Sequence, residues 1–576
     1  MGLIKSIINK KEIFLTNEKI EWELHLNNKF QELVINPFNT KEFKIEGYFR
    51  FPNKAIKKVY AFYFKSNNLA VNFQKEEKQL GKEDEYYQKE ITKGFANEMF
   101  LIRFLTKETG EYHLNLKVTF KNKVIEEQQL VFSVKENKTS QSKGVLKVEQ
   151  RHKRNFIFEN GETFIPVGQN NAWYTSSTRK LDDYRVWFSK MRENNANFTR
   201  IWLNTRSFAL HSGEKFDNFI SRMNNVNELD QVIELAIKNN LYFMLTLLQH
   251  GQFSAKVNPA WKHNKWNKEN GGILSSPEEF FTNPRAKEIY QQQLIYLVAR
   301  YGHLENLAAW ELWNEVDWTD NFNSFNVVEW HDEMTKFIKE IDIYGHLVTT
   351  SYKHLKGEGF YLKSIDYANP HSYDYTNLNI NSELVKVIEE LHGLYKKPIL
   401  HSEIGIDWRT GKGTYQKDPE GITIKQNHWG AILGGGAGGG MNWWWDSFVH
   451  FGDLYFQFKG IGKFVKKMNM VSEKYQLLQT LKTVKVSSSQ IKLIGYLLDD
   501  RSYGYLYHKD FKYNNKVNEI KNVLVEIPFN NGNCLIEIYN TTTGEVEETL
   551  KMEVLNEKVS FKVNILSDKA FIAIQL

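Results

Sequence analysis

Between residues 146 and 472, short apolar runs alternate with segments whose apolar residues recur at helical spacing. Leu181, Tyr184, Phe188 and Met191, for example, would share one face of a helix. Eight of the apolar runs have the length of strands: 164–169, 197–203, 241–248, 307–313, 346–350, 367–371, 398–403 and 441–445. Strands that alternate with helices build parallel βαβ units, and eight such units predict an α/β fold with a (β/α)8 TIM barrel.

The alternative for this pattern is an open, doubly wound parallel sheet, which is usually marked by a glycine-rich turn after its first strand. Here the first run is followed by Asn170, Asn171, Ala172 and Trp173, without a glycine. The stretch 434–440 contains a formal GxGxxG match, but a tryptophan-rich apolar run follows it. Dinucleotide binding needs a strand before the glycines and a helix after them, so we favour the barrel and predict no cofactor.

The two ends of the chain have a different pattern, in which apolar and polar residues alternate over short runs. Residues 113–120 alternate in this way. Such runs, separated by polar turns, predict an N-terminal Ig-like β-sandwich over 1–135 and a C-terminal β-sandwich over 473–576. The polar stretch 136–145 predicts a linker that leads into a barrel domain over 146–472.

Composition and charge exclude several classes of protein. The 576 residues include 75 Lys and Arg against 69 Asp and Glu, a net charge of +6 without a basic stripe, so we predict no nucleic-acid partner. No apolar run reaches the roughly 18 residues of a membrane helix, so we predict no membrane partner. The N-terminus lacks a signal-peptide pattern and Cys534 is the one cysteine. Together these predict a cytoplasmic protein, or a secreted one if a leader has been removed.

Two of the predicted barrel strands end in a glutamate. The fourth run leads into Asn314 and Glu315, and the seventh ends at Glu403. Catalytic side chains of TIM barrels project from the carboxyl ends of the strands, so these two glutamates would face each other across the barrel mouth. Two opposed carboxyl groups suit the cleavage of a glycosidic bond, because one protonates the leaving oxygen while the other attacks the anomeric carbon or activates water.

The segment 310–315, Trp-Glu-Leu-Trp-Asn-Glu, resembles the Asn-Glu signature of retaining (β/α)8 glycoside hydrolases, the large clan that includes family 5 cellulases and mannanases. The resemblance implies that Glu315 is the catalytic acid/base and that Glu403 is the nucleophile. It also implies that Asn314 hydrogen-bonds the 2-hydroxyl of the sugar that is cleaved. The expected substrate is therefore a carbohydrate with β-glycosidic bonds.

Five further residues match positions of the same clan, and the resemblance implies that they bind substrate or support the glutamates. Arg200 resembles the strand-two arginine that supports the nucleophile, and His250 resembles a strand-three histidine. His371 and Tyr373 resemble the strand-six His-x-Tyr pair, whose tyrosine contacts the nucleophile. Trp445 resembles the strand-eight tryptophan that forms the floor of the subsite where the bond breaks.

The order of the predicted domains resembles multi-domain bacterial proteins of this clan whose N-terminal β-sandwich has no known function. Glu311 has the same strand parity as Glu315, and we interpret it as a structural carboxylate with a buried partner. The stretch 250–281, which contains Trp261 and Trp266, is predicted to be a substrate-binding loop. No spacing of His, Cys or Asp predicts a metal site. The alternative function is a non-catalytic carbohydrate-binding or scaffold protein that keeps the barrel fold.

Overall fold

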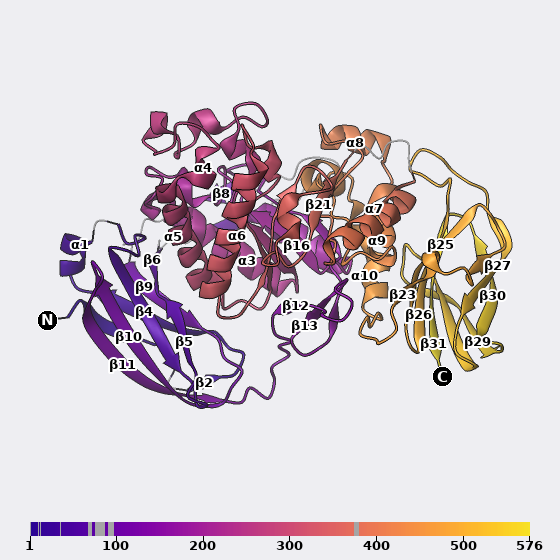
Figure 1. The fold of residues 1–576 in the computed structure, drawn as a ribbon, viewed down its shortest axis with the longest axis horizontal. Helices are drawn as coiled ribbons and strands as arrows, with labels where there is room; N and C mark the ends of the chain where they lie inside the picture. Colours follow the sequence, from indigo (N-terminus) through magenta and orange to yellow (C-terminus); the bar gives the residue numbers. More distant parts are fainter. Residues whose placement is uncertain are drawn as a thin grey trace.

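The computed structural model describes residues 2–9, 11, 13–34, 36–66, 72–74, 87–89, 97–373 and 379–576. Its parts follow one another from left to right in Figure 1: N-terminal sheets, a central α/β part and C-terminal sheets. No helix within these ranges is long and apolar enough to cross a membrane.

Two sheets form the N-terminal part, with strand orders β1-β3-β9-β6 and β2-β11-β10-β4-β5. Trp22 on β3 contacts Phe49 on β4 and Phe132 on β11, with ring centroids 5.7 and 5.0 Å apart. The sheets therefore face each other across an aromatic core. The bounds are β1 (Ile4–Ile8), β2 (Ile13–Leu15), β3 (Ile20–Leu26), α1 (Lys29–Leu33), β4 (Phe43–Arg50), β5 (Ile56–Tyr60), β6 (Phe62–Ser66), β7 (Asn72–Gln74), β8 (Tyr87–Lys89), β9 (Asn97–Phe104), β10 (Gly110–Phe120) and β11 (Lys123–Lys135).

The central part contains parallel strands that pair in chain order. The first sheet has the order β15-β16-β17-β18-β19 and the second β20-β21-β22. Isolated parallel bridges join Asn442 to Gln169 on β15 and to Ile404 on β22, so the outer edges of the two sheets meet at this residue. The bounds are β15 (Gly168–Asn170), β16 (Phe198–Trp202), β17 (Tyr242–Thr246), β18 (Leu307–Glu311), β19 (Leu347–Thr349), β20 (Ser351–Tyr352), β21 (Asn369–Ser372) and β22 (Glu403–Ile404).

The eighth predicted strand, 441–445, is wrong as a strand. Only Asn442 is bridged there, and Trp445 already begins a helical segment, Trp445–His450. The glycine-rich stretch explains the difference, because glycine favours turns and weakens strands. Each of the other seven runs contains or overlaps an observed strand, shorter than predicted.

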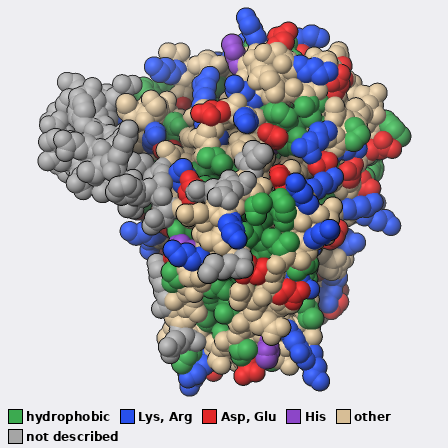
Figure 2. Space-filling view, turned by 90° about the vertical axis from the view of Figure 1, so that its left-hand side faces the viewer, with side chains coloured by type: hydrophobic (Ala, Val, Ile, Leu, Met, Phe, Trp, Pro, Cys, Tyr) green, Lys and Arg blue, Asp and Glu red, His purple; other side chains and the backbone are tan. Residues whose placement is uncertain are grey.

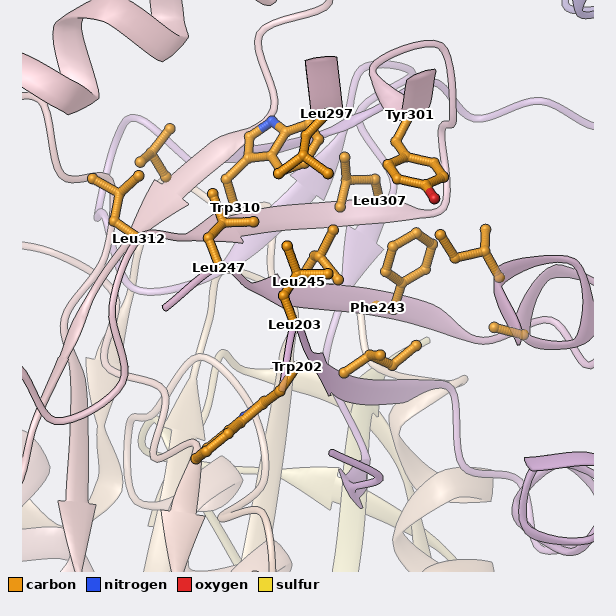
Figure 3. Close-up of a cluster of buried hydrophobic side chains, with 14 of the residues drawn as sticks. Trp202, Leu203, Phe243, Leu245, Leu247, Leu297, Tyr301, Leu307, Trp310 and Leu312 are labelled. Carbon is orange, nitrogen blue, oxygen red and sulfur yellow. The ribbon is translucent and has the colours of Figure 1, made fainter. Parts of the chain in front are cut away.

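Helices cover the outer side of these strands (Figure 1). Side chains on alternate positions of β17 and β18, including Leu245 and Trp310, pack against Leu297 and Tyr301 of α5 (Figure 3). The intervening residues, such as Thr246 and Glu311, point to the inner side, where Thr246 Oγ1 donates to Glu311 at 2.5 Å. The helices are α2 (Leu181–Glu193), α3 (Met223–Lys238), α4 (Glu279–Thr282), α5 (Pro284–Tyr301), α6 (Ser324–Ile341), α7 (Ile380–Tyr395), α8 (Gly411–Lys417), α9 (Ile422–Leu433) and α10 (Lys459–Val465).

A small antiparallel sheet lies against the amino ends of the parallel strands. It has the order β12-β13-β14, and Phe156 on β13 contacts Tyr367 just before β21, with ring centroids 5.3 Å apart. Its strands are β12 (Leu146–Val148), β13 (Phe156–Phe158) and β14 (Thr163–Phe164). This sheet leaves the opposite, carboxyl ends of the strands to form the candidate site.

The C-terminal part consists of a six-stranded sheet, β23-β25-β26-β31-β28-β29, and a three-stranded sheet, β24-β27-β30. Trp429 on α9 stacks on Tyr505 at 5.3 Å, and buried Lys425 pairs with Asp568 at 3.0 Å, so this part is joined firmly to the central one. The strands are β23 (Gln476–Leu477), β24 (Lys485–Val486), β25 (Ile491–Leu497), β26 (Arg501–His508), β27 (Ile520–Pro528), β28 (Gly532–Tyr539), β29 (Val546–Val554), β30 (Lys558–Ile565) and β31 (Asp568–Gln575).

The N-terminal sheets pack on α3 and α5 of the central part. Phe38 contacts Phe219 and Tyr296 with ring centroids 4.8 and 5.2 Å apart, and the Arg300 guanidinium lies 5.3 Å from the ring of Phe62. On the described part of the face shown in Figure 2, basic and acidic side chains are interspersed.

Candidate active site

Glu315 and Glu403 come together at the carboxyl ends of the parallel strands. Glu315 lies four residues beyond the end of β18, and Glu403 begins β22. One carboxylate oxygen of each glutamate and one ring nitrogen of His371 all lie within 4.8 Å of one another. The side chain of Glu403 is 5% exposed and that of Glu315 is 13% exposed, so both carboxyl groups are accessible only from the mouth.

Arg200 on β16 lies on the inner side of the strands and hydrogen-bonds four other residues of the site. Its guanidinium, which is fully buried, donates to both oxygens of Glu311 at 2.7 and 2.8 Å and to Glu403 Oε1 at 2.7 Å. It also donates to Asn314 Oδ1 at 2.7 Å and to Asn170 Oδ1 at 3.1 Å. Glu311 is therefore the paired structural carboxylate that its strand parity indicated, and Arg200 contacts the second glutamate as predicted.

His371 and Tyr373, both from the end of β21, contact the two glutamates. His371 Nδ1 lies 2.9 Å from Glu315 Oε1 and 3.6 Å from Glu403 Oε2, and its Nε2 lies 2.9 Å from Ser402 Oγ. The Tyr373 hydroxyl donates to Glu403 Oε2 at 2.6 Å. Each oxygen of Glu403 thus has a donor from another strand, Arg200 from β16 for Oε1 and Tyr373 from the end of β21 for Oε2.

His250 and Asn314 lie beside Glu315. His250 Nδ1 is 3.4 Å from Glu315 Oε2 and 3.3 Å from Asn314 Nδ2, while its Nε2 is 2.9 Å from Asn258 Nδ2. Asn314 Oδ1 is occupied by Arg200, so the amide nitrogen of Asn314 is the group left to meet a sugar hydroxyl. Seven of the eight predicted site residues are therefore in one contiguous cluster.

Electrostatics distinguish the two glutamates. Burial raises the pKa of Glu315, which faces two histidines. Burial also raises the pKa of Glu403, but Arg200 and the Tyr373 hydroxyl oppose this by stabilising its carboxylate. Burial lowers the pKa of both His250 and His371, so these rings are neutral near pH 7. Of the two carboxyl groups, Glu403 is better suited to be charged and Glu315 to hold a proton.

The backbone of Glu315 is in the left-handed region, with φ 48° and ψ 56°. Its amide donates to Ser351 Oγ at 3.1 Å, and the turn Val316–Trp318 follows directly. A non-glycine residue in this region costs on the order of 1–3 kcal/mol, which the surrounding structure must supply. The strained turn directs the Glu315 carboxyl group back over the strand ends, toward His371.

Trp445 is the predicted site residue that the structure places elsewhere. It is 2% exposed and packs against Trp173 and against Trp187 of α2, with ring centroids 5.0 and 6.3 Å away. The reason is that the chain turns into a helical segment at Trp445, which carries the ring into the layer beneath α2. The prediction that Trp445 is the subsite floor is therefore wrong.

Trp443, two residues before Trp445, is more exposed and packs beside a ring that contacts Arg200. It is half-buried, and the centroids of its ring and that of Trp202 are 5.1 Å apart. The Arg200 guanidinium in turn lies 4.9 Å from the centroid of the Trp202 ring. Asn442 points outward to Asn427 of α9, so the flanking residue Trp443 points to the inner side. Trp443 and Trp445 have the same strand parity, so the sequence pattern alone does not separate them; their difference in exposure does.

The loop 250–281 does not offer its tryptophans to a ligand. Trp261 is 8% exposed and Trp266 is 1% exposed, and Trp266 packs against Phe280 with ring centroids 5.0 Å apart. These aromatic residues form a core within the loop, which holds His250 at the mouth. The contribution of the loop to the site is therefore His250, with Asn258 behind it.

One group of described residues, Glu315, His371 and Glu403, has ligand atoms close enough together to consider a metal ion. Both ring nitrogens of His371 already contact oxygen atoms, of Glu315 and of Ser402. A metal would have to break one of these contacts. The same atoms suit acid–base chemistry without rearrangement.

No protein-family model matches the chain. Sequence relatives are plant proteins. The chain is 33% identical over 143 residues to mannan endo-1,4-β-mannosidase 5 of Arabidopsis thaliana, covering 23% of the chain and 31% of that protein. It is 24% identical over 272 residues to mannan endo-1,4-β-mannosidase 1 of Oryza sativa subsp. japonica, covering 39% and 62%. The matches thus span less than two thirds of these relatives.

Solved structures resemble the chain over a greater length. A Bacteroides vulgatus protein described as a glycoside hydrolase aligns with 98% of this chain and all of its own, with a TM-score of 0.63 and 13% identity. A second glycoside hydrolase covers 75% of the chain with a TM-score of 0.50 and 14% identity. The α/β fold is therefore shared with solved glycoside hydrolases, and the predicted resemblance to (β/α)8 glycoside hydrolases of the family 5 clan is confirmed.

Proposed function

We propose that the chain is a retaining glycoside hydrolase that cleaves β-glycosidic bonds through a covalent glycosyl-enzyme intermediate. The proposal depends on one observation above all, the oxygens of Glu315 and Glu403 within 4.8 Å of each other. Retaining enzymes have carboxyl groups roughly 5–5.5 Å apart, whereas inverting enzymes need roughly 6.5–9.5 Å to admit a water molecule between them. The spacing favours direct attack by one carboxylate over activation of water.

The surroundings of the pair assign the two roles. Glu403, held as a carboxylate by Arg200 and Tyr373, attacks the anomeric carbon while Glu315 gives its proton to the glycosidic oxygen. The bond to the leaving sugar breaks and an ester with Glu403 forms. Glu315 then takes a proton from water while the water oxygen attacks the same carbon. The ester bond to Glu403 breaks, and the sugar is released with its anomeric configuration retained.

We propose β-1,4-linked mannan or its oligosaccharides as the substrate. The support is the two relatives described above, which are named as mannan endo-1,4-β-mannosidases and match parts of this chain. Within the site, Asn314 Nδ2 is available to donate to a sugar hydroxyl, and Trp443 offers a partly exposed ring. A sugar ring has an apolar face that stacks on such an aromatic surface.

Rescue chemistry tests the roles of the glutamates. We expect Glu403→Ala to abolish turnover of an aryl β-manno-oligoside and azide to restore it partly as the α-glycosyl azide, because the anion enters the vacated space. We expect Glu315→Ala to lose most activity on substrates with basic leaving groups and little on activated ones. Glu311→Ala serves as the matched control, because it removes a neighbouring carboxylate and leaves nothing for azide to rescue. Full activity of Glu403→Ala would refute the proposal.

The alternative, a non-catalytic carbohydrate-binding protein, predicts binding without turnover. Calorimetry with β-1,4-manno-oligosaccharides, followed by product analysis, separates the two. Binding that leaves every oligosaccharide intact, over pH 4 to 8 and with β-1,4-glucan and β-1,4-mannan probes, would favour the alternative. The two-glutamate mechanism instead predicts a bell-shaped dependence of kcat/KM on pH, since Glu403 must be charged and Glu315 protonated.

We also propose the finer architecture: a closed eight-stranded barrel over 146–472, a β-sandwich over 1–135 and another over 473–576, with a linker at 136–145. The bridges at Asn442 and the facing of the N-terminal sheets support it. Limited proteolysis at the linker tests the division of the chain. A cytoplasmic location stays a proposal, which fractionation of the native host tests.

A further inference from the structure

The turn that carries Glu315 is joined to the neighbouring strand at two successive points. The Glu315 amide donates to Ser351 Oγ at 3.1 Å, and the Lys353 amide donates to Asp317 Oδ1 at 2.8 Å. Ser351 begins β20 and Lys353 directly follows this strand. Asp317, two residues beyond Glu315, therefore fastens the residues after Glu315 to the end of β20 with its own side chain.

The far end of the same turn is held by the loop 250–281. The Asp320 amide donates to the Phe253 carbonyl oxygen at 3.1 Å, and its carboxylate accepts from Ser254 Oγ at 2.8 Å. A residue in the left-handed region, such as Glu315 with φ 48°, costs on the order of 1–3 kcal/mol. Attachments on both sides of the turn offset this cost and hold the Glu315 carboxyl group in place.

Asp317 also brings a second carboxyl group close to the acid/base. Burial raises the pKa of Asp317, and the bond from the Lys353 amide opposes this, together with the charges of His354 and Lys353. The ammonium group of Lys353 lies 3.4 Å from the centroid of the Trp318 ring, where a cation is attracted to the ring face. The carboxylate form of Asp317 is thus supported by the chain that follows β20.

The charge of Asp317 acts on Glu315. Burial raises the pKa of Glu315, and Asp317 raises it further, because a like charge nearby disfavours the ionised form. The cations Arg200 and Lys353 act in the opposite direction. The titratable and charged groups that face these two carboxyl groups are Arg200 on β16, His250 after β17, His371 on β21, Glu403 on β22, and Lys353 and His354 after β20.

We propose that Asp317 is a positioning residue for Glu315, which anchors the turn of the acid/base on the end of β20 and whose negative charge keeps Glu315 protonated. The inference rests on the proposed function, in which Glu315 gives its proton to the leaving oxygen. The anchor and the charge can be separated, because asparagine keeps a carbonyl oxygen as acceptor without the charge, whereas alanine removes both.

Two variants at this position test the two roles. We expect Asp317→Ala to lower kcat/KM roughly 10- to 100-fold on glycosides with basic leaving groups and less than about threefold on activated aryl glycosides, because a misplaced acid slows only reactions that need its proton. We expect Asp317→Asn to recover most of this loss at low pH. Its basic limb should lie at lower pH than that of the wild type, because loss of the negative charge lowers the pKa of Glu315.

Asp366→Asn is the matched control. Asp366 also accepts from the backbone of a neighbouring strand, the Val348 amide at 2.7 Å, but it precedes β21 and lies at the amino ends of the strands. This variant should keep the wild-type basic limb and the wild-type response to the leaving group. Titration of the Glu315 carboxyl group by carbon-13 NMR, assigned with Glu315→Gln, measures the same pKa change without turnover.

The outcomes separate this inference from the proposed function. Equal losses of Asp317→Ala on both kinds of leaving group, or a basic limb and a Glu315 titration that Asp317→Asn leaves in place, would overturn the role of Asp317. Should Asp317→Ala fail to fold, Asp317→Asn decides. Equal losses of Glu315→Ala on both kinds of leaving group would overturn the proposed function instead, and the NMR titration would still test whether Asp317 acts on Glu315.

Discussion

Replacing Arg200 by lysine keeps the positive charge and removes the planar guanidinium group with its several N–H donors. The guanidinium makes five hydrogen bonds: two to Glu311 and one each to Glu403, Asn314 and Asn170. An ammonium group has three donors on one atom, so it cannot reach the acceptors on both sides. Arg200→Lys therefore leaves at least one buried carboxylate short of a donor.

The size of the effect follows from the bonds that are lost. A hydrogen bond to a charged group is worth about 1.5–3 kcal/mol, so losing two lowers the free energy of unfolding by about 3–6 kcal/mol. If the bond to Glu403 is one of the two, its loss alone disfavours the Glu403 carboxylate by about 1.5–3 kcal/mol. At about 1.4 kcal/mol per unit, the pKa of Glu403 rises by about 1–2 units. Because the proposed mechanism requires Glu403 to be charged, it predicts that the acid limb of the pH profile moves upward by that amount.

The assay is the pH dependence of kcat/KM on an activated aryl β-manno-oligoside, which reports ionisations of the free enzyme, together with denaturant unfolding. Arg300→Lys is the matched control. Arg300 is also fully buried and donates to both oxygens of Asp230, at 2.9 and 2.6 Å, but it lies on α5 away from the glutamates. It should lose similar stability and keep the wild-type acid limb. An acid limb that stays in place in Arg200→Lys, or moves equally in Arg300→Lys, would refute the reasoning.

Other positions give sharper contrasts. Tyr373→Phe removes one donor from the nucleophile, so kcat/KM should fall by about tenfold and the acid limb should rise by up to about one unit; an unchanged profile contradicts the contact. Trp443→Ala should raise KM for mannotriose several-fold at nearly constant stability, whereas Trp445→Ala should cost about 3–5 kcal/mol of unfolding free energy; the reverse pattern would restore Trp445 as the floor. Asp568→Asn leaves Lys425 buried without its anion and should lower the unfolding free energy by about 3–5 kcal/mol. Burial opposes ionisation of Asp568, but Lys425 and two hydroxyl groups hold its pKa below the ordinary value. The difference in unfolding free energy between the wild type and Asp568→Asn should therefore vanish as the pH falls through that pKa. A difference that persists in acid contradicts this.

The residues at strand ends were predictable because their role is tied to position. Glu315 follows one apolar run, Glu403 ends another and Arg200 lies late in a third, and the fold brings the carboxyl ends of such runs together. Period-two alternation within a run likewise separated inner from outer side chains, as Glu311 and Trp310 illustrate.

Supporting residues were not predictable in the same way. Thr246 and Asn369 contact Glu311, and Ser402 contacts His371, but each is a single neutral residue within a strand. Such residues are common wherever a strand meets a turn, and only the three-dimensional register shows which acceptor they face. Trp445 was misplaced because Trp443 and Trp445 have the same strand parity, and the sequence does not show that the chain turns into a helical segment at Trp445.

The meeting of the two sheets at Asn442 has a consequence for how the chain is made. Gln169 pairs with Thr199, 30 residues further on, but its other neighbour is Asn442, 273 residues away. Closing the longer loop costs about 2 kcal/mol more conformational entropy than the shorter one, on a logarithmic scale of loop length. During synthesis, the parallel strands β15 to β22 therefore leave the ribosome with open edges at β15 and β22 until the tryptophan-rich segment is made. A nascent chain stalled before residue 442 would hold both glutamates and still expose edges that invite association.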